Sequence, residues 1–492
     1  MSTLDNPEAV MATPQEPQMT GGDLEALPSL PPAANYPVPA PMPGKSVVKK
    51  PGRSLAQKIV IGVLTAAVGV TGAITVYLNS EYRPAFRPPG VGGPEVPGVP
   101  VPAVPCELPG NSWLFGLCGS GDDNLGSVAV SGSGTIFAVG STSSQNGSFT
   151  ELHTQRSAVN GFVAVVRPDG NLWLQRDANE IYNVTTSPDG TVVAVGVTYF
   201  DDPVATVIKY GDTGSVVWLK QFEMEYLMHA RLIGSATGQD GAILAWGYAE
   251  SYDDEPETHA IMAKFSTGGE LMWSRDLGDA DAVFGSPRSA VVDEHGNLFL
   301  VGAAAYDGFA GDAMIAKFSP TGDLLWSKTF GGSLGQFNAA TTAPNGNIVV
   351  VGTSHPLSSV FSVSGVLAEI DQNGELVAYW THEYESLLSF NDIVPMPDGG
   401  YAIAGDAGDY SQDALVLVVR DLAEMNNPDF LVWQKTFGGS GSDSFGSIAV
   451  DSNGDIVVAG STDSQDGTLP HTDGSEDGVI LKLTANGDLI PR

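Results

Sequence analysis

The side chains best suited to catalysis or metal binding are scattered along this sequence. Its seven histidines include no His-x-His or His-Glu-x-x-His motif, the spacings that bring two imidazoles to one metal ion. They are His153, His229, His259, His295, His355, His382 and His471. The histidines therefore indicate neither a metal centre nor a general base, and we expect them to be loop residues.

Carboxylates gather in two acidic stretches that could hold a hard cation such as calcium. These are "YAESYDDEPE" (248–257) and "STDSQDGTLPHTDGSEDG" (461–478). Calcium takes about six to eight oxygen ligands, but neither stretch follows the Asp-x-Asn/Asp-x-Asn/Asp-Gly pattern with its distal Glu. Solvated loops are favoured over a calcium site, and no cofactor is expected.

Two cysteines, Cys106 and Cys118, follow a Pro/Gly-rich stretch. An even count in an exported segment favours one disulfide, while two unpaired buried thiols are the alternative. Two cysteines without a nearby histidine pattern do not match zinc spacing.

A repeat of about fifty residues organises the chain that must position these side chains. A turn followed by an apolar strand ending in glycine occurs seven times, at Gly140, Gly196, Gly247, Gly302, Gly352, Gly405 and Gly460. Tryptophan recurs with a similar period, at Trp113, Trp173, Trp218, Trp273, Trp326, Trp380 and Trp433. Only Trp246 falls outside that series. We expect the repeated tryptophans to be packing anchors, because a large aromatic side chain buries much area.

Each repeat reads as four short strands separated by Gly, Asn, Pro and Ser turns. Seven such units predict an all-β fold, a seven-bladed β-propeller spanning 111–492. The last unit ends before any tryptophan, whereas 111–117 ("NSWLFGL") has the sequence of the missing strand. We therefore predict that this segment completes the last blade as its outer strand, beside "GVILKL" (478–483) or the following "GDLI", which leaves no open edge.

The repeats resemble those of bacterial exported and cell-surface β-propeller proteins. The resemblance covers about residues 112–490 and is strongest in "LVWQKTFGGSGSDSFGSIAVDSNGDIVVAGSTDSQDG" (431–467). The second unit departs from the pattern, since it lacks the Gly-Gly-Ser turn. The resemblance implies architectural roles for the shared residues and a binding module without a catalytic set.

The N-terminal region predicts membrane anchoring. Residues 1–58 are a Pro-rich tail, expected to be disordered, that ends in a basic cluster; 59–78 ("IVIGVLTAAVGVTGAITVYL") are uncharged and would span roughly 30 Å as a helix. Residues 79–110 read as a Pro/Gly-rich stalk. Cations before the apolar stretch predict a cytoplasmic N-terminus and an extracytoplasmic propeller in a single-pass membrane protein, because positive charges stay inside. A cleaved signal peptide is the alternative, although its apolar region begins nearer the N-terminus.

The formal net charge of -35 argues against nucleic acid as a partner, because phosphate backbones are bound by clustered Lys and Arg. We expect a non-enzymatic, membrane-anchored binding or scaffold module for an extracellular protein or glycan, because variable polar loops on a rigid scaffold are where binding occurs. The alternative is an exported hydrolase or lyase that uses loop carboxylates such as Asp253, Asp254 and Glu257 with a channel histidine. A third hypothesis adds a cytoplasmic partner of the Pro-rich tail.

Overall fold

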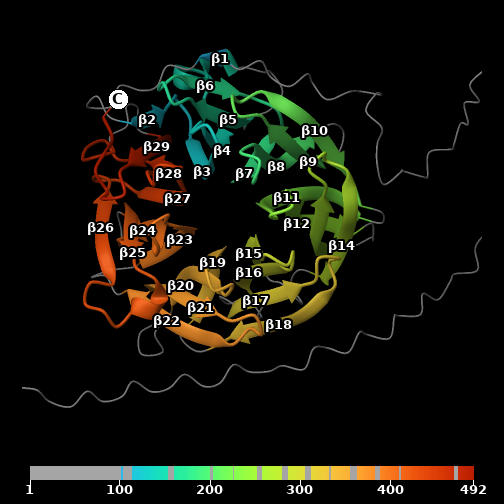
Figure 1. Cartoon of the computed structure of the whole chain (residues 1–492). Helices are drawn as coiled ribbons and strands as arrows, with labels where there is room; N and C mark the ends of the chain where they lie inside the picture. Colours follow the sequence, from blue (N-terminus) through green and yellow to red (C-terminus); the bar gives the residue numbers. More distant parts are fainter. Residues whose placement is uncertain are drawn as a thin grey trace, which may run out of the picture. The chain divides into compact units, whose positions relative to one another are not determined.

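The computed structural model describes residues 101–102, 113–152, 160–199, 203–224, 227–251, 257–279, 286–304, 312–331, 334–354, 363–382, 388–408, 412–469 and 475–491. These residues form seven antiparallel β-sheets arranged as a ring, with β3, β7, β11, β15, β19, β23 and β27 innermost (Figure 1). The predicted seven-bladed β-propeller is confirmed. The tail 1–58, the apolar segment 59–78 and most of the stalk lie outside the described residues. Within the described residues, no helix has the length and apolar character needed to cross a membrane.

Blades 2 to 6 each consist of four consecutive strands, which run in chain order from the innermost position outward. Blade 2 contains β7 (Glu180–Thr186), β8 (Val192–Tyr199), β9 (Pro203–Tyr210) and β10 (Val216–Phe222); blade 3 contains β11 (Leu227–Thr237), β12 (Ile243–Ser251), β13 (Thr258–Phe265) and β14 (Leu271–Asp279). Blade 4 contains β15 (Ser286–Val292), β16 (Leu298–Ala303), β17 (Ala313–Phe318) and β18 (Leu324–Phe330); blade 5 contains β19 (Leu334–Thr342), β20 (Ile348–Ser354), β21 (Ser364–Ile370) and β22 (Leu376–His382). Blade 6 contains β23 (Leu388–Pro395), β24 (Tyr401–Ala407), β25 (Asp413–Val419) and β26 (Leu431–Phe437).

Blade 7 joins the two ends of the propeller. Its strands β27 (Asp443–Val450), β28 (Ile456–Thr462) and β29 (Asp477–Leu483) are completed at the outer edge by β2 (Leu114–Leu117). Leu114 lies opposite Leu481 in this antiparallel pairing, and the Trp113 N–H donates to the Ile490 carbonyl at 2.7 Å. The predicted closure by strand exchange is confirmed, and it uses both C-terminal segments that the sequence proposed.

Blade 1 has a fifth strand that the sequence did not predict. Its strands β3 (Asp123–Val130), β4 (Ile136–Thr142), β5 (Asn160–Val166) and β6 (Leu172–Gln175) are followed at the outer edge by β1 (Val101–Pro102); the short helix η2 (Gly147–Leu152) follows β4. Val101 lies opposite Leu174, and Pro102 opposite Trp173. This part of the expected stalk pairs with β6 because the free edge of a sheet offers unpaired backbone groups, and an edge strand tolerates proline.

The core consists of seven apolar clusters, each built from two neighbouring blades. Each recurring tryptophan packs against one of these clusters from the outer part of the preceding blade. The indole N–H groups of Trp218, Trp273 and Trp433 donate to carbonyl oxygens in a turn of the next blade, at 3.3, 3.1 and 2.8 Å. These side chains therefore link each outer strand to the following sheet.

The recurring glycines have a steric cause. Each lies opposite a β-bulge in the innermost strand of its own blade. A Cβ added at Gly140 or Gly460 would lie 1.8 Å from a backbone carbonyl oxygen of the neighbouring strand. Only glycine fits this close approach, which fixes both the bulge and its register.

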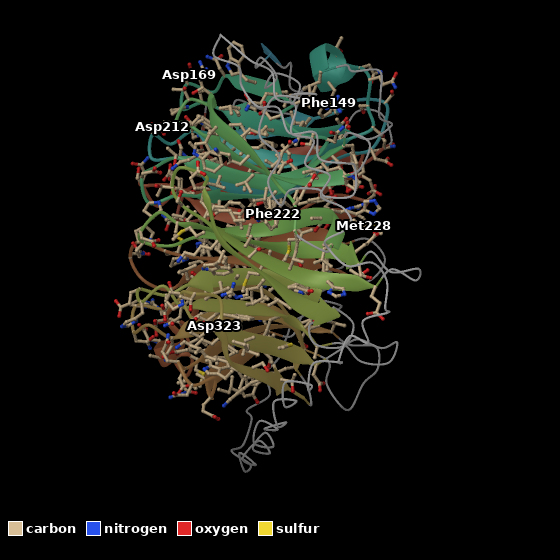
Figure 2. The ribbon with its side chains drawn as sticks, turned by 90° about the vertical axis from the view of Figure 1, so that its right-hand side faces the viewer. Phe149, Asp169, Asp212, Phe222, Met228 and Asp323 are labelled. Atoms are coloured by element: carbon tan, nitrogen blue, oxygen red, sulfur yellow. The ribbon has the colours of Figure 1, made fainter. Side chains whose placement is uncertain are left out.

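The two faces of the ring differ. On one, the turn face, thirteen hairpin connections among the described residues are tight turns with a glycine at positive φ, such as Gly170 and Gly322. On the other, the loop face, the connections between second and third strands range from residues 200–202 in blade 2 to residues 143–159 in blade 1. Figure 2 shows Asp169, Asp212 and Asp323 on the turn face and Phe149 and Met228 toward the opposite side.

Candidate functional site

A central channel of about 830 Å³ runs along the innermost strands of all seven blades. The bulged residue of every innermost strand lines it. These residues are, from blade 1 to blade 7, Gly126, Tyr182, Ile233, Arg288, Asn338, Asn391 and Gly446. The bulge lies slightly nearer the loop face in five of the seven strands, at the middle of β19 and nearer the turn face in β11.

Hydrogen bonds connect the innermost strands around part of the ring. In four blades, the side chain directly after the bulge accepts a backbone N–H of the next blade. The pairs are Ser127 with Val184, Asn183 with Ser235, Asp392 with Ile448 and Ser447 with Val128, at 3.1, 3.0, 2.9 and 3.1 Å. In blades 3 and 5 the corresponding residues, Gly234 and Ala339, have no acceptor in the side chain. Some polar side chains of the channel wall thus serve to connect neighbouring blades by hydrogen bonds.

Asp392 is the one carboxylate among the described channel-lining residues. Its Oδ1 accepts the Ile393 N–H at 2.8 Å, and its Oδ2 accepts the Ser447 hydroxyl at 2.9 Å as well as the Ile448 N–H. Burial raises the pKa of Asp392 to about 6, although the three hydrogen bonds oppose this shift. With both oxygens occupied, Asp392 links blades 6 and 7 and is poorly placed to act as a general base.

A tyrosine and glutamate cluster lies at the loop-face end of blade 2. The hydroxyls of Tyr182 and Tyr199 both donate to the Glu180 carboxylate, the second at 2.7 Å. Burial, followed by these hydrogen bonds, raises the pKa of each tyrosine above its usual value. The hydroxyls therefore stay protonated at neutral pH and act as hydrogen-bond donors.

The histidines do not converge. The expectation that they are loop residues is wrong for His229, His259 and His382, which lie in β11, β13 and β22. The ring nitrogen Nδ1 of His229 is 2.8 Å from Glu250 and that of His259 is 2.9 Å from Asp276. No described histidine lines the channel. The remaining ones, His153, His355 and His471, lie outside the described residues.

The predicted carboxylate sites are only partly described. Asp253 and Asp254 lie outside the described residues, and Glu257 is tied to Ser251 through its backbone. No group of three or more potential metal-binding side chains occurs among the residues that the structure describes.

The thiol of Cys118, which is buried beside β2, is not free. Its expected partner Cys106 lies outside the described residues, so their pairing stays a prediction.

Sequence reasoning missed the channel residues. They follow no motif, because their common feature is a bulge that appears only when two strands pair. One signal was present: Trp246, the tryptophan outside the repeat series, lines the channel from β12.

No family model matches the chain, and no curated protein matches it. The resemblance to bacterial surface repeats is therefore not shown beyond the fold itself.

Several solved structures share the propeller architecture at low identity. A puromycin hydrolase is 14% identical with a TM-score of 0.46 over 75% of this chain, which spans about half (53%) of the length of that protein. The Pan2 WD40 domain of Neurospora crassa is 11% identical with a TM-score of 0.42, over 72% of this chain and 88% of that one. The periplasmic gluconolactonase of Pseudomonas aeruginosa is 14% identical with a TM-score of 0.38, over 60% of this chain and 81% of that one. These similarities concern the fold and indicate no activity.

Proposed function

We propose that the protein is a binding module whose loop face receives an extracytoplasmic protein or glycan. The observation that carries this proposal is the difference between the two faces. The turn face carries tight turns of one pattern, whereas the loop face carries connections that differ widely in length. Variable loops on a rigid scaffold are the usual place for recognition.

The polar cluster at the loop-face end of blade 2 supports the same proposal. Tyr182 and Tyr199 offer an aromatic body with a polar tip, a combination enriched in binding surfaces. Ser120 and Ser440 are exposed in the connections beside blade 7. Together these residues provide hydrogen-bonding groups on the loop face for a polar partner.

The test is affinity capture from intact cell envelopes with the full chain. A variant in which residues 153–159 are replaced by a short Gly/Ser linker shortens the long connection 143–159 of blade 1. The matched control replaces Asp323 on the turn face by Asn. Loss of the captured partner with the loop variant alone supports the proposal, and equal capture by both variants contradicts it for this loop.

The proposal includes membrane anchoring by 59–78 with the propeller outside the cytoplasm. It rests on the basic cluster that precedes the apolar segment and on the length of that segment. A cytoplasmic partner for the Pro-rich tail belongs to the same proposal.

The alternative of an exported hydrolase or lyase is tested by turnover. The purified protein, offered a panel of glycosides, esters and lactones, is expected to show no turnover above that of a buffer blank. Turnover that disappears on replacing Asp253, Asp254 or Glu257 by its amide would favour the enzyme.

A further inference from the structure

Trp246 breaks the pattern of its position in the repeat. It directly precedes the recurring glycine of the second strand, where the other blades have a small or β-branched residue. Those residues are Val139, Val195, Val301, Val351, Ala404 and Ala459. Trp246 is also the one described channel-lining residue that does not come from an innermost strand.

A second exception, at Gly234, makes room for this indole. A Cβ at Gly234 would lie 2.1 Å from Cζ2 of Trp246. At this position, directly after the bulge, four of the other blades use a side chain to accept a hydrogen bond from the next blade, and blade 3 has no such acceptor. In blade 3, Gly234 and Trp246 thus place an aromatic side chain at the channel, where four other blades have a hydrogen bond to the next blade.

The indole of Trp246 is buried without a hydrogen-bond partner. Its exposed fraction is 3%, and its Nε1 has no acceptor among the described residues. Buried N–H groups without a partner are rare in folded proteins, so each calls for an explanation. Trp246 packs in the cluster that includes Ala290 of β15 and Leu300 of β16, which places it beside the two inner strands of blade 4.

Arg288 is the bulged residue of that same strand, two positions before Ala290. It is exposed, lines the channel and is the one cation among the described channel-lining residues. Within the part of the chain that the structure describes, no ion pair or hydrogen bond involves its guanidinium. In the next blade Asn338 also lines the channel, and its Oδ1 is buried without a described donor. Blades 3 to 5 therefore bring an aromatic ring, an exposed guanidinium and an amide to one side of the channel.

The two bulged residues on the opposite side of the channel are glycines and carry no side chain. Gly446 and Gly126 occupy the bulges of the adjacent blades 7 and 1. The nearest atom to an added Cβ would be 3.6 Å away at Gly446 and 4.0 Å away at Gly126. At the level of the bulges, the side chains of blades 3 to 5 thus have no side chain opposite them on blades 7 and 1.

We propose that this side of the channel binds a small organic monocarboxylate that carries hydroxyl groups, such as a sugar acid. The carboxylate pairs with the Arg288 guanidinium, whose planar donors match it in a bidentate geometry. The carbon skeleton lies beside Trp246, and its hydroxyls supply the partners that the indole N–H and the Asn338 Oδ1 lack among the described residues. The channel volume of about 830 Å³ lies within the range of about 300–1,000 Å³ found for small-molecule pockets.

A single negative charge fits this site better than a dianion. Only one described cation lines the channel, the Asp392 carboxylate lines it too, and the whole chain has a formal net charge of -35. A phosphate dianion would therefore meet more repulsion than one guanidinium offsets. This site does not depend on the loop-face partner, since it lies inside the ring.

The test is isothermal titration calorimetry on the full chain in a non-ionic detergent, with D-glucuronate, D-gluconate, neutral D-glucose and inorganic phosphate as probes. At least one sugar acid is expected to bind, and Arg288→Gln should weaken it by about tenfold or more, because a charge-assisted pair is lost. Arg288→Lys should keep part of the affinity, and Trp246→Phe should weaken binding by about two- to tenfold.

Arg420→Gln is the matched control, because this arginine lies in the connection between β25 and β26 and does not line the channel. It should bind the sugar acid as the unmodified chain does. Unchanged melting temperatures would show that each variant is folded. The proposal is overturned if neither sugar acid binds, if D-glucose binds equally well, if phosphate binds more tightly, or if Arg288→Gln and Arg420→Gln have equal affinities.

Discussion

Gly460 lies opposite the bulge of β27, where an added Cβ would come within 1.8 Å of the Ser444 carbonyl oxygen. Gly460→Ala must therefore push two paired strands apart. We expect the free energy of unfolding to fall by about 3 kcal/mol or more, at the upper end of overpacking costs. Denaturant unfolding measures it. Gly126→Ala, whose Cβ would find no atom nearer than 4.0 Å, is the control and should change it by less than about 1 kcal/mol. Equal losses in both variants would contradict the steric account.

Asp392 is expected to make the stability of the protein depend on pH. Burial raises the pKa of its carboxyl to about 6, above the usual 3.8. Below the lower value, the carboxyl is protonated in both the folded and the unfolded state. As the pH rises toward 6, the unfolded chain releases this proton before the folded protein does, so the protein loses stability.

Relative to Asp392→Asn, the protein should therefore lose about 2 to 3 kcal/mol of unfolding free energy between pH 4 and pH 7, at about 1.4 kcal/mol per pKa unit. Unfolding measured at several pH values tests this difference. The exposed Asp398→Asn is the matched control. The account fails if the pH dependence of Asp392→Asn parallels that of the unmodified chain.

At the scale of elements, β2 is the strand that closes the ring. It covers the outer edge of β29 and buries Leu114, Phe115 and Leu117. A chain that begins at residue 122 should therefore melt at a lower temperature than one that begins at residue 105, since deleting one large core side chain alone costs about 3 to 5 kcal/mol. The exposed edge should also promote self-association. Equal melting temperatures and a monomeric short form would show that closure is unimportant.

Blades could be predicted from the sequence because their signals are local. Each repeat contains its own apolar strands, glycine turns and tryptophan. The segment around Trp113, before the first repeat, has the sequence of the strand that the last repeat lacks. Even the divergent second repeat forms a complete blade, because its apolar strands remain although its Gly-Gly-Ser turn is absent. The channel lining could not be predicted in this way. Arg288 and Asn338 reach the channel only through bulges, which arise from the pairing of two strands.

The strand β1 could not be predicted from the sequence for a different reason. Val101–Pro102 has the composition of the stalk, and it becomes a strand only because the edge of β6 is available.

At the scale of the whole molecule, the sequence predicts that residues 1–58 stay in the cytoplasm and that the propeller is outside. Protease added to intact cells should digest the propeller or its stalk and leave an N-terminal tag protected. Cells opened with detergent are the control, in which the tag must become accessible. A tag that is digested on intact cells while the C-terminus is protected would reverse the orientation.

The central claim is that the loop face, and not the turn face, meets the partner. It is tested most directly by a photo-crosslinking amino acid placed at single exposed positions of the full chain in living cells. Ser120 and Ser440 represent the loop face, and Asp212 and Asp323 the turn face (Figure 2). The account predicts a crosslinked extracytoplasmic partner from the first pair and none from the second. Crosslinks to that partner from Asp212 or Asp323, with none from Ser120 or Ser440, would contradict it.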